Sequence, residues 1–292
     1  MKSIIIGAGS DLGVHIDGAH LGPAKLIDEI KDTCNEEILS YVQDEHFVKS
    51  KDINDKAKNL NEVNNFNKML YSKIKEKMRN NIFPITLGGD HSVAIASSLA
   101  DCAVNKDIGI IWFDAHTDYN TFDTTVSGNI HGLPLAAING IDCDKLTAFH
   151  NGFMINPKNT VIVGARSIDP LELEVLKKTD VTIFTTNDIK KYGVRYICDK
   201  AFDIACNNTK SVHISFDLDL IDPSYAPGVS TAEDNGISKE DAISINNIIL
   251  EHIDKISSYD LVEYNPLNDK NSKTKKIASK ILNDTLQKIK EK

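Results

Sequence analysis

The stretch W-F-D-A-H-T-D-Y-N at residues 112–120 carries three ionisable side chains on every second residue. Asp114, His116 and Asp118 directly follow the apolar run I-G-I-I-W-F, which predicts a buried strand. Side chains at positions i, i+2 and i+4 of a strand point to the same side, so these three share one face at the strand's end. Burying unpaired carboxylates costs several kcal/mol each, which predicts that positive charge lies beside them.

Polar and ionisable side chains also follow four other apolar runs, each of which predicts a strand. The runs are I-F-P-I-T-L, T-V-I-V-G, S-V-H-I-S-F and Y-D-L-V. Ligands of open parallel sheets bind outside the carboxyl ends of the strands, so we expect these side chains to meet at one edge. They are Asp90, His91, Arg166, Asp169, Asp217, Asp219 and Glu263.

Two imidazoles and four carboxylates from these strand ends form a candidate metal-binding set. Carboxylates with a minority of imidazole suit Mn²⁺, and Fe²⁺ or Co²⁺ also fit. Six side chains exceed the needs of one ion, which favours two divalent ions bridged by shared carboxylates and a hydroxide. No C-x-x-C motif supports a structural zinc site. The predicted ligands are His91, Asp114, His116, Asp118, Asp217 and Asp219.

Each of these motifs also has a purely structural interpretation. A D-x-D after a strand is often a turn or a helix cap, and Asp114 and Asp118 could cap a following helix. A single buried histidine such as His91 is more often a hydrogen-bonded core residue than a ligand. The metal-site hypothesis therefore depends on the coincidence of all the motifs at predicted strand ends.

Apolar strand patterns alternate with helical patterns along most of the chain. This alternation predicts an α/β fold with a mostly parallel sheet and helices on both faces. Apolar residues spaced by three or four predict an amphipathic helix within 52–80, and Pro23 marks the start of an earlier helix. Further helices are expected at 170–178, at 238–256 and from about Lys273. No linker or repeat appears, so residues 1–292 are predicted to form a single domain.

The composition is that of an ordinary globular protein. Of its 292 residues 41% are hydrophobic, and a net charge of -9 without a long basic stripe argues against nucleic acid as a partner. No segment approaches the roughly 20 apolar residues that span a bilayer, so we expect no membrane partner. The five cysteines form no C-x-x-C and no secretory signal precedes them, which predicts reduced thiols in a cytoplasmic protein.

Five short motifs combine the candidate residues: G-G-D-H-S at 88–92, D-A-H-T-D-Y-N at 114–120, S-G-N-I-H-G at 127–132, S-F-D-L-D-L-I-D-P at 215–223 and V-E-Y-N-P at 262–266. In this combination and order the sequence resembles the arginase family, the manganese ureohydrolases. The resemblance covers the chain from about residue 4 to the C-terminus. It implies a three-layer α-β-α sandwich with a mostly parallel central sheet, and two Mn²⁺ ions per subunit.

The resemblance also implies how the six ligands are shared between the two ions. Asp114 and Asp217 would bridge both ions. His91 and Asp118 would complete the first site, and His116 and Asp219 the second.

The reaction that the resemblance implies is hydrolysis of L-arginine to L-ornithine and urea, by attack of a hydroxide that bridges the two metals. A guanidinium carbon is a poor electrophile, which is why water must become hydroxide near neutral pH. His131 would give the leaving amine its proton, since histidine titrates near the working pH. Glu263 would pair with the substrate guanidinium, and Asp118 is also assigned to the catalytic group. The structural alternatives are a loop histidine for His131 and a surface charge for Glu263.

Residues matched to the family motifs would also recognise the amino-acid end of the substrate, which favours L-arginine. The matched positions are Asn120, Thr125 and Ser127 for the carboxylate, Asp169 and Glu172 for the ammonium group, and Thr231 beside the pocket. Two departures bear on substrate identity. Ser167 stands where the family usually has an acid, and the stretch S-T-A-E-D-N-G at 230–236 replaces the family's G-T-P-x-x-G-G.

Three other functional interpretations stay open. The first is another ureohydrolase, acting on agmatine, guanidinobutyrate or formiminoglutamate. A two-metal phosphoesterase is disfavoured because the sequence has no H-x-H pair. An inactive metal-binding scaffold would have no chemical reason to keep His131 and Glu263. The resemblance further implies a small guanidino substrate and a homo-oligomer, either a trimer or a hexamer.

Overall fold

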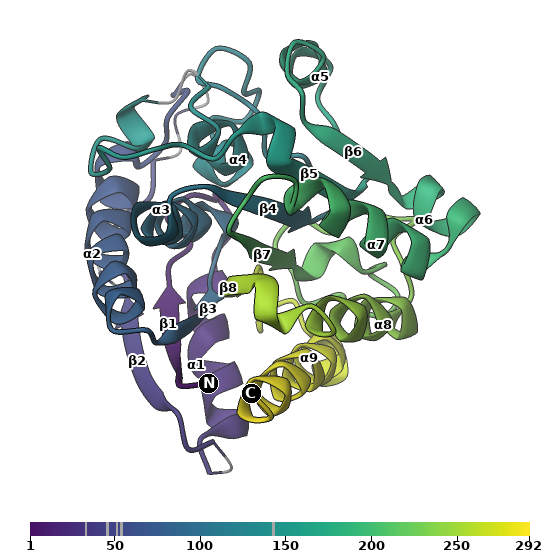
Figure 1. Ribbon diagram of the computed structural model, residues 1–292. Coiled ribbons are helices and arrows are strands. Elements are labelled where there is room, and N and C mark those ends of the chain that lie inside the picture. Colours follow the sequence, from purple (N-terminus) through teal and green to yellow (C-terminus); the bar gives the residue numbers. More distant parts are fainter. Residues whose placement is uncertain (33, 45–46, 51, 53–54, 142–143) are drawn as a thin grey trace.

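A computed structural model describes residues 1–292 except 33, 45–46, 51, 53–54 and 142–143 (Figure 1). Within the described residues, an eight-stranded sheet runs in the order β2-β1-β3-β8-β7-β4-β5-β6, and neighbouring strands are parallel. The predicted α/β class with a parallel sheet is therefore confirmed. The strands are β1 (Ser3–Gly9), β2 (Glu37–Val42), β3 (Phe83–Gly88), β4 (Ile108–Phe113), β5 (Thr160–Ala165), β6 (Thr182–Thr185), β7 (Ser211–Asp217) and β8 (Ile256–Val262).

Helices cover both faces of the sheet, as Figure 1 shows. One face carries α2 (Leu60–Arg79), α3 (Ala94–Asn105) and α4 (Pro134–Ile138). The opposite face carries α1 (Gly22–Ile30), α6 (Thr186–Tyr192), α7 (Val194–Ala205), α8 (Lys239–Leu250) and α9 (Lys273–Lys290). The short helix α5 (Pro170–Leu176) follows β5. Strands covered on both faces must be apolar on both, which explains their nearly continuous apolar runs.

The side chains of each strand divide between two hydrophobic cores. In β4, Ile110 and Trp112 pack on the face with α2 and α3, whereas Ile111 and Phe113 pack on the face with α7 and α8. This alternation is the period of two that a strand imposes on its side chains. The three layers are thus held together by burial of apolar surface on both sides of one sheet.

Several predicted boundaries need correction. The helix expected within 52–80 begins at Leu60, and residues 51, 53 and 54 lie outside the described part of the chain. The helix expected at 238–256 ends at Leu250, because β8 already begins at Ile256. Strand β2 and helices α4, α6 and α7 were not predicted. Strand β2 lies at the sheet edge and is only partly buried, so its sequence lacks the apolar run of a central strand.

The strand order positions the candidate site. The five strands that end in candidate residues are neighbours in the order β3-β8-β7-β4-β5, although they lie far apart in the sequence. Backbone hydrogen bonds continue beyond the ends of these strands: Asp114 N donates to Val163 O at 3.1 Å, and Glu263 N donates to Gly89 O at 2.8 Å. A Cβ at Gly89 would lie 1.9 Å from the carbonyl oxygen of Ser10, so only glycine allows this close approach.

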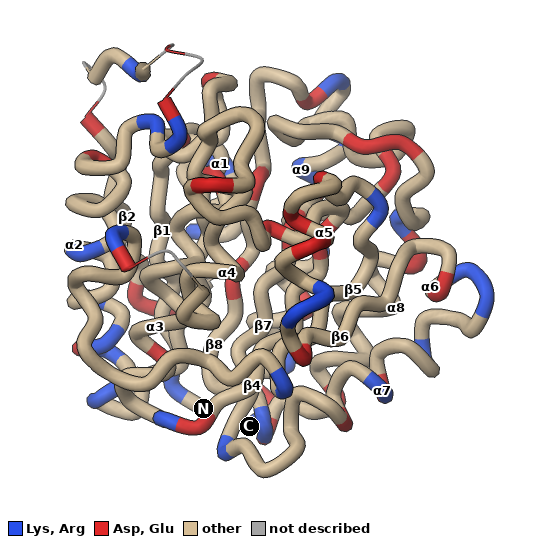
Figure 2. The backbone as a smooth tube through the Cα atoms, turned by 90° about the horizontal axis from the view of Figure 1, so that it is seen from above, with Lys and Arg blue, Asp and Glu red and all other residues tan. Residues whose placement is uncertain are grey.

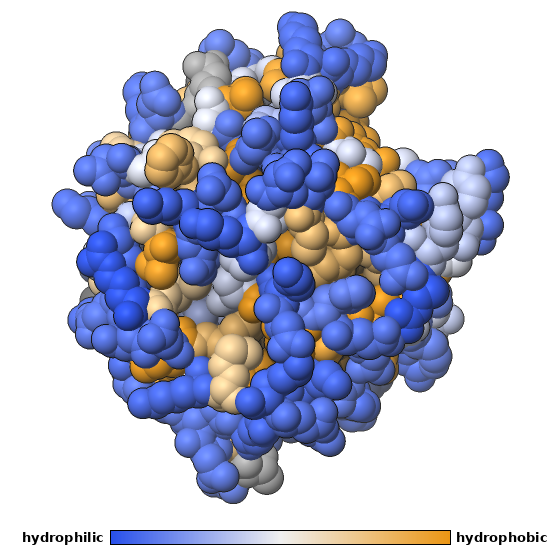
Figure 3. All heavy atoms as spheres, viewed as in Figure 1, coloured by the Kyte–Doolittle hydropathy of each residue, from blue (hydrophilic) through white to orange (hydrophobic). Residues whose placement is uncertain are grey.

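None of the helices in the described residues is long and apolar enough to cross a membrane. Figure 2 shows Lys and Arg distributed around the whole outline, and the face drawn in Figure 3 is mostly hydrophilic. Cys34, Cys102, Cys198 and Cys206 carry free thiols, while Cys143 lies outside the described residues.

Substitution of Gly109 tests how closely α7 packs against the sheet. A Cβ at this position in β4 would lie 2.0 Å from the carbonyl oxygen of Ala205, a backbone atom that cannot move away alone. We expect Gly109→Ala to lower the free energy of unfolding by about 1–3 kcal/mol, measured by chemical denaturation. The matched control is Gly7→Ala in β1, where the nearest atom is the flexible end of Ile27, at 2.9 Å. An equal loss in both variants would contradict the prediction.

Candidate metal centre and active site

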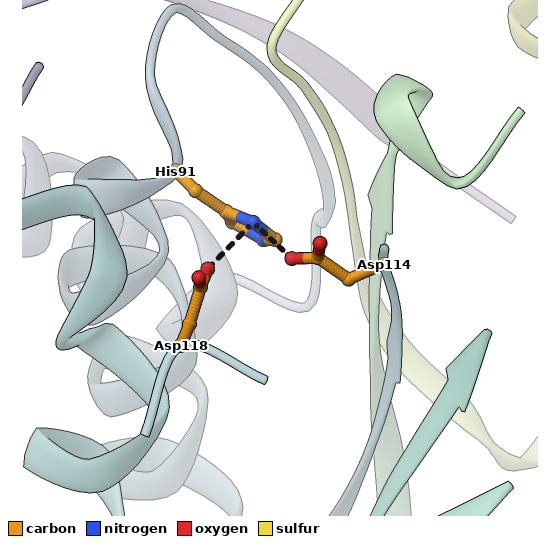
Figure 4. A group of neighbouring side chains, drawn as sticks. All are labelled: His91, Asp114 and Asp118. Atoms are coloured by element: carbon orange, nitrogen blue, oxygen red, sulfur yellow. Dashed lines mark ion pairs between the residues drawn. The ribbon is translucent and has the colours of Figure 1, made fainter. Parts of the chain in front are cut away.

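The imidazole of His91 lies among three carboxylates in the buried interior beyond β3, β4 and β7. Figure 4 shows it between Asp114 and Asp118. Its Nδ1 atom lies 3.0 Å from Asp114 Oδ2, 3.1 Å from Asp118 Oδ2 and 3.0 Å from Asp217 Oδ2. One ring nitrogen is therefore the common neighbour of three carboxylate oxygens from two strand ends.

A second group of ligand atoms lies beside the first and shares Asp114 with it. His116 Nδ1 lies 3.0 Å from Asp219 Oδ2 and 3.4 Å from Asp114 Oδ1. Asp114 thus directs one oxygen to each imidazole. Within His91, Asp114 and Asp118, and again within Asp114, His116 and Asp219, the ligand atoms all lie within 4.8 Å of one another. The structure therefore brings together all six predicted metal ligands.

The hydrogen bonds of His91 leave its Nδ1 atom facing the carboxylates. Its Nε2 lies 2.8 Å from Ser215 Oγ, whereas Nδ1 has no hydrogen-bond partner among the described residues despite its three close neighbours. With the proton on Nε2 donated to Ser215, Nδ1 presents a lone pair. A lone pair and three carboxylate oxygens that converge without hydrogen-bond geometry are the donor set of a cation site.

The electrostatics of the cluster also call for a cation. Burial raises the pKa of Asp118 to about 7, and the charge of Asp114 adds to this effect. Burial likewise raises the pKa values of Asp217 and Asp219, with further repulsion from neighbouring carboxylates. Of the four carboxylates in the cluster, Asp114 alone has a lowered pKa, because its contacts with His116 and His91 outweigh its burial. Four carboxylates held this closely repel one another until positive charge is supplied.

Trp112 and Ser215 support the cluster and were not among the predicted site residues. The Trp112 indole donates to Asp114 Oδ2 at 2.9 Å and stacks on His91 with ring centroids 3.9 Å apart. Ser215 Oγ lies 2.8 Å from His91 Nε2. Each of these residues precedes a predicted ligand by two positions on the same strand face. That spacing is the sequence signal that could have identified them.

The alternative interpretation, in which the aspartates serve as turn or helix-cap residues, is partly correct. Asp217 Oδ1 accepts a hydrogen bond from Asp219 N at 2.7 Å and caps the short helix Leu218–Leu220. Asp114 Oδ1 similarly accepts from His116 N at 2.6 Å. These oxygens shape the turns, while the Oδ2 atoms of both residues still face His91. Capping and cation binding are therefore compatible in the same side chains.

His131 and Glu263 face each other beside the cluster. His131 Nδ1 lies 3.2 Å from Glu263 Oε1, which also accepts from His91 N at 2.9 Å. Glu263 is only 1% exposed, so it is not the surface charge of the structural alternative. Burial alone would lower the pKa of His131, but Glu263 reverses the shift and raises it. The other oxygen, Glu263 Oε2, has no hydrogen-bond partner among the described residues.

Two site residues have left-handed backbone conformations that L-amino acids seldom adopt. Asp118 has a φ of 47° and Glu263 a φ of 66°. Such conformations persist only where the surroundings enforce them, and they are frequent at functional sites. Here they direct two carboxylates into the same buried space.

The residues predicted for the ammonium side of the substrate lie at the start of α5. Asn120 Nδ2 donates to Asp169 Oδ2 at 3.1 Å. Glu172 is buried and accepts from two backbone groups, Tyr119 N at 2.7 Å and Asp169 N at 3.0 Å. Glu172 therefore ties the loop of Asn120 to the loop of Asp169. Thr231 lies near the metal cluster and donates to Asp219 Oδ2 at 3.3 Å.

Thr125 and Ser127, predicted for the carboxylate side, lie in the loop after Asn120. Among the described residues, the Thr125 hydroxyl accepts from Gly128 N and the Ser127 hydroxyl from Asn129 N. Lys56 and Lys58 donate to the backbone carbonyls of Thr125 and Ser127, at 2.5 and 2.7 Å. The loop is thus held from the segment before α2, and the hydrogen bonds of its two hydroxyls lie within the loop itself.

Comparison with known proteins agrees with this geometry. The family model of the arginase family matches residues 1–287. The arginase of Bacillus subtilis strain 168 is 36% identical over 97% of both chains. The structure of arginase from Bacillus caldovelox superposes with a TM-score of 0.89 at 31% identity over 98% of both chains.

Other solved structures show how the similarity varies within the fold. Entamoeba histolytica arginase in complex with L-ornithine gives a TM-score of 0.89 at 29% identity over 97% of this chain and 98% of the other. A hypothetical agmatinase from Burkholderia thailandensis is more distant, with a TM-score of 0.75 and 21% identity over 99% of this chain and 86% of the other, and shows the fold alone. With its family match extending over nearly the whole sequence, the chain belongs to the arginase family.

Proposed function

We propose that this protein hydrolyses the guanidinium group of L-arginine to give L-ornithine and urea, as a hydrolase that depends on two Mn²⁺ ions. The observation that carries the proposal is the shared carboxylate of Asp114, whose two oxygens face two imidazole nitrogens in adjacent ligand groups. A substrate with a planar guanidinium and a reaction that needs activated water fit such a centre. The similarity to curated arginases over nearly the full chain supports L-arginine as the substrate.

The residues present fit a pair of manganese ions. His91, Asp114, Asp118 and Asp217 would hold one ion, and Asp114, His116, Asp217 and Asp219 the other. Oxygen-rich sites with a minority of imidazole suit Mn²⁺. When bound, such a pair lowers the pKa of water and so supplies a hydroxide nucleophile near neutral pH.

Glu263 and His131 are the groups that act on the substrate. The unpartnered Oε2 of Glu263 is buried and can accept a hydrogen bond from a guanidinium N–H. Its other oxygen faces His131 Nδ1, so one carboxylate orients both the substrate and the imidazole. Loss of urea leaves an amine that requires a proton, and we assign its delivery to His131. The raised pKa of His131 keeps a proton available for this step.

We assign the amino-acid end of the substrate to the loops that follow β4 and β5. Asp169 offers a carboxylate to the ammonium group, and its contact with Asn120 links it to the side of the site assigned to the substrate carboxylate. Thr125 and Ser127 would complete that side. Agmatine has no carboxylate and would leave this part of the site without a partner, which favours L-arginine over a decarboxylated substrate.

The oligomeric state and the cellular location stay predictions. We propose a homo-oligomer, a trimer or hexamer, which light scattering on the purified protein tests directly. The cytoplasmic location expected from the cysteines and the sequence is tested by cell fractionation.

The decisive experiment measures urea release by the Mn²⁺-loaded protein from L-arginine and from agmatine, with a metal-stripped control. We expect metal-dependent urea from L-arginine and little from agmatine. A preference for agmatine would mean that Ser167 and the 230–236 loop have redirected the pocket. Absence of urea from both would refute the proposed substrate and turn attention to guanidinobutyrate and formiminoglutamate.

His131→Ala should separate proton delivery from metal binding. We expect kcat for urea release to fall by about 10²–10⁴-fold, because a positioned general acid contributes that much. Manganese content, measured by elemental analysis, should stay at the wild-type value, since His131 is not among the proposed ligands. Loss of both ions from the variant would instead make His131 a ligand or a structural support.

Removal of the metal should make stability depend on pH. A group whose pKa is higher in the folded than in the unfolded state stabilises the protein below its unfolded pKa, and this contribution is lost as the pH rises through the folded pKa. For Asp118 that window extends from 3.8 to about 7. The raised pKa values of His91 and His116, which their carboxylate neighbours cause against the effect of burial, act in the same direction.

We therefore expect the Tm of the metal-free protein to fall as the pH rises from about 5 to about 7.5. Saturating Mn²⁺ should remove most of this fall, because the ions replace the missing positive charge. Metal-free Asp118→Asn serves as the control and should show a flatter profile by calorimetry. If the Tm of the metal-free protein stayed level or rose over this range, repulsion among the buried carboxylates of the cluster would be contradicted.

A further inference from the structure

Glu233 brings a carboxylate to the far side of His116, outside the six proposed ligands. Its Oε1 atom lies 3.5 Å from His116 Nε2 and accepts a hydrogen bond from Ser167 Oγ at 3.1 Å. His116 Nδ1 meanwhile faces Asp114 and Asp219. The imidazole is thus held between the metal cluster on one side and Glu233 on the other.

Arg166 holds the loop of Glu233 in place from the end of β5. Its guanidinium donates to the carbonyl oxygens of Glu233 at 2.9 Å and of Asp234 at 3.1 Å. The same side chain donates to Asp219 O at 2.7 Å and Leu220 O at 3.1 Å, within the turn that carries a proposed ligand. One guanidinium therefore fixes the 230–236 loop against that turn, and the position of Glu233 follows from this anchoring.

We propose that Glu233 is a positioning residue for His116, accepting a hydrogen bond from its Nε2–H so that the Nδ1 lone pair faces the second ion. The inference rests on the proposed metal pair. Histidine ligands commonly donate their other ring N–H to a carboxylate, which selects the tautomer, orients the ring and raises its basicity as a ligand. Glu233 comes from the stretch in which this chain departs from the family pattern, so the role depends on this chain's own loop.

The two histidines are oriented in different ways, which makes the proposal specific. His91 meets the neutral hydroxyl of Ser215, whereas His116 meets a carboxylate. Loss of Glu233 should therefore weaken the binding of the ion held by His116 and leave the binding of the ion held by His91 unchanged. Ser167 provides a second test, because its Oγ lies within hydrogen-bond distance of the Glu233 carboxylate. An aspartate at position 167 would bring a carboxylate to the same region from a different element.

The experiment is a Mn²⁺ titration of the metal-stripped protein, in which isothermal calorimetry gives the Kd of each ion. In Glu233→Ala we expect the affinity for one of the two ions to fall by about 10–100-fold, the range typical for such carboxylates, while the affinity for the other ion is unchanged. The double variant with Ser167→Asp and Glu233→Ala should recover most of the lost Mn²⁺ affinity. Asp234→Ala removes a neighbouring exposed charge and should bind both ions as the wild type does.

The outcomes distinguish this inference from the proposed function. A wild-type protein that binds no Mn²⁺ overturns the metal pair and the role of Glu233 with it. A wild type that binds two ions, together with unchanged affinities in Glu233→Ala, overturns the role of Glu233 alone. If Glu233→Ala bound both ions equally more weakly, the effect would be a general one of the loop or of its charge, and the positioning role would be refuted. The same holds if Asp234→Ala lost as much Mn²⁺ affinity as Glu233→Ala.

Discussion

The burial of four carboxylates around two imidazoles is the constraint on which the rest of the structure depends. Such a group would be strongly unfavourable without compensating positive charge. The chain nevertheless holds Asp114, Asp118, Asp217 and Asp219 almost completely away from solvent. The indole of Trp112 and the hydroxyl of Ser215 fix the geometry further. A fold that builds such a site is preorganised for a cation before any substrate arrives.

The sheet makes this concentration of charge possible. Ligands from three separate parts of the chain meet because β3, β7 and β4 end at the same edge, with β8 between the first two. Helices on both faces bury the strands over their length, and the site lies beyond their carboxyl ends, where open parallel sheets bind their ligands. The same architecture explains why Glu263, at the end of β8, lies next to His91 and His131 rather than at the surface.

The sequence could predict those parts of the arrangement that follow from the alternation of side chains along a single strand. The D-x-H-x-D and D-x-D spacings depend only on the alternation of side chains along a strand, and the six predicted ligands lie together. Strand order was not predictable, because it depends on contacts between distant segments. Strand β2 was missed because an edge strand needs no apolar run. The left-handed conformations of Asp118 and Glu263 were also missed, since a positive φ is uncommon for any residue other than glycine, even for aspartate, in which it is enriched.

The contact between Glu233 and His116 lies at the limit of what sequence can indicate. The departures at Ser167 and within 230–236 were visible separately, but nothing in their spacing joined them. Their proximity depends on Arg166, which bonds carbonyl oxygens of the loop and of the turn after β7. Two changes that look independent along the chain thus converge on a single imidazole.

The two sides of the site differ in how freely they can vary. His91 is buried and stacked on Trp112, so a change there would disturb the core. The side chain of His116 is 24% exposed and that of Glu233 is 39% exposed. The 230–236 loop contacts the cluster through two partly exposed groups, Glu233 at His116 and Thr231 at Asp219. Variation in this loop can therefore alter the mouth of the site and one ion's surroundings while the buried ligand set stays intact.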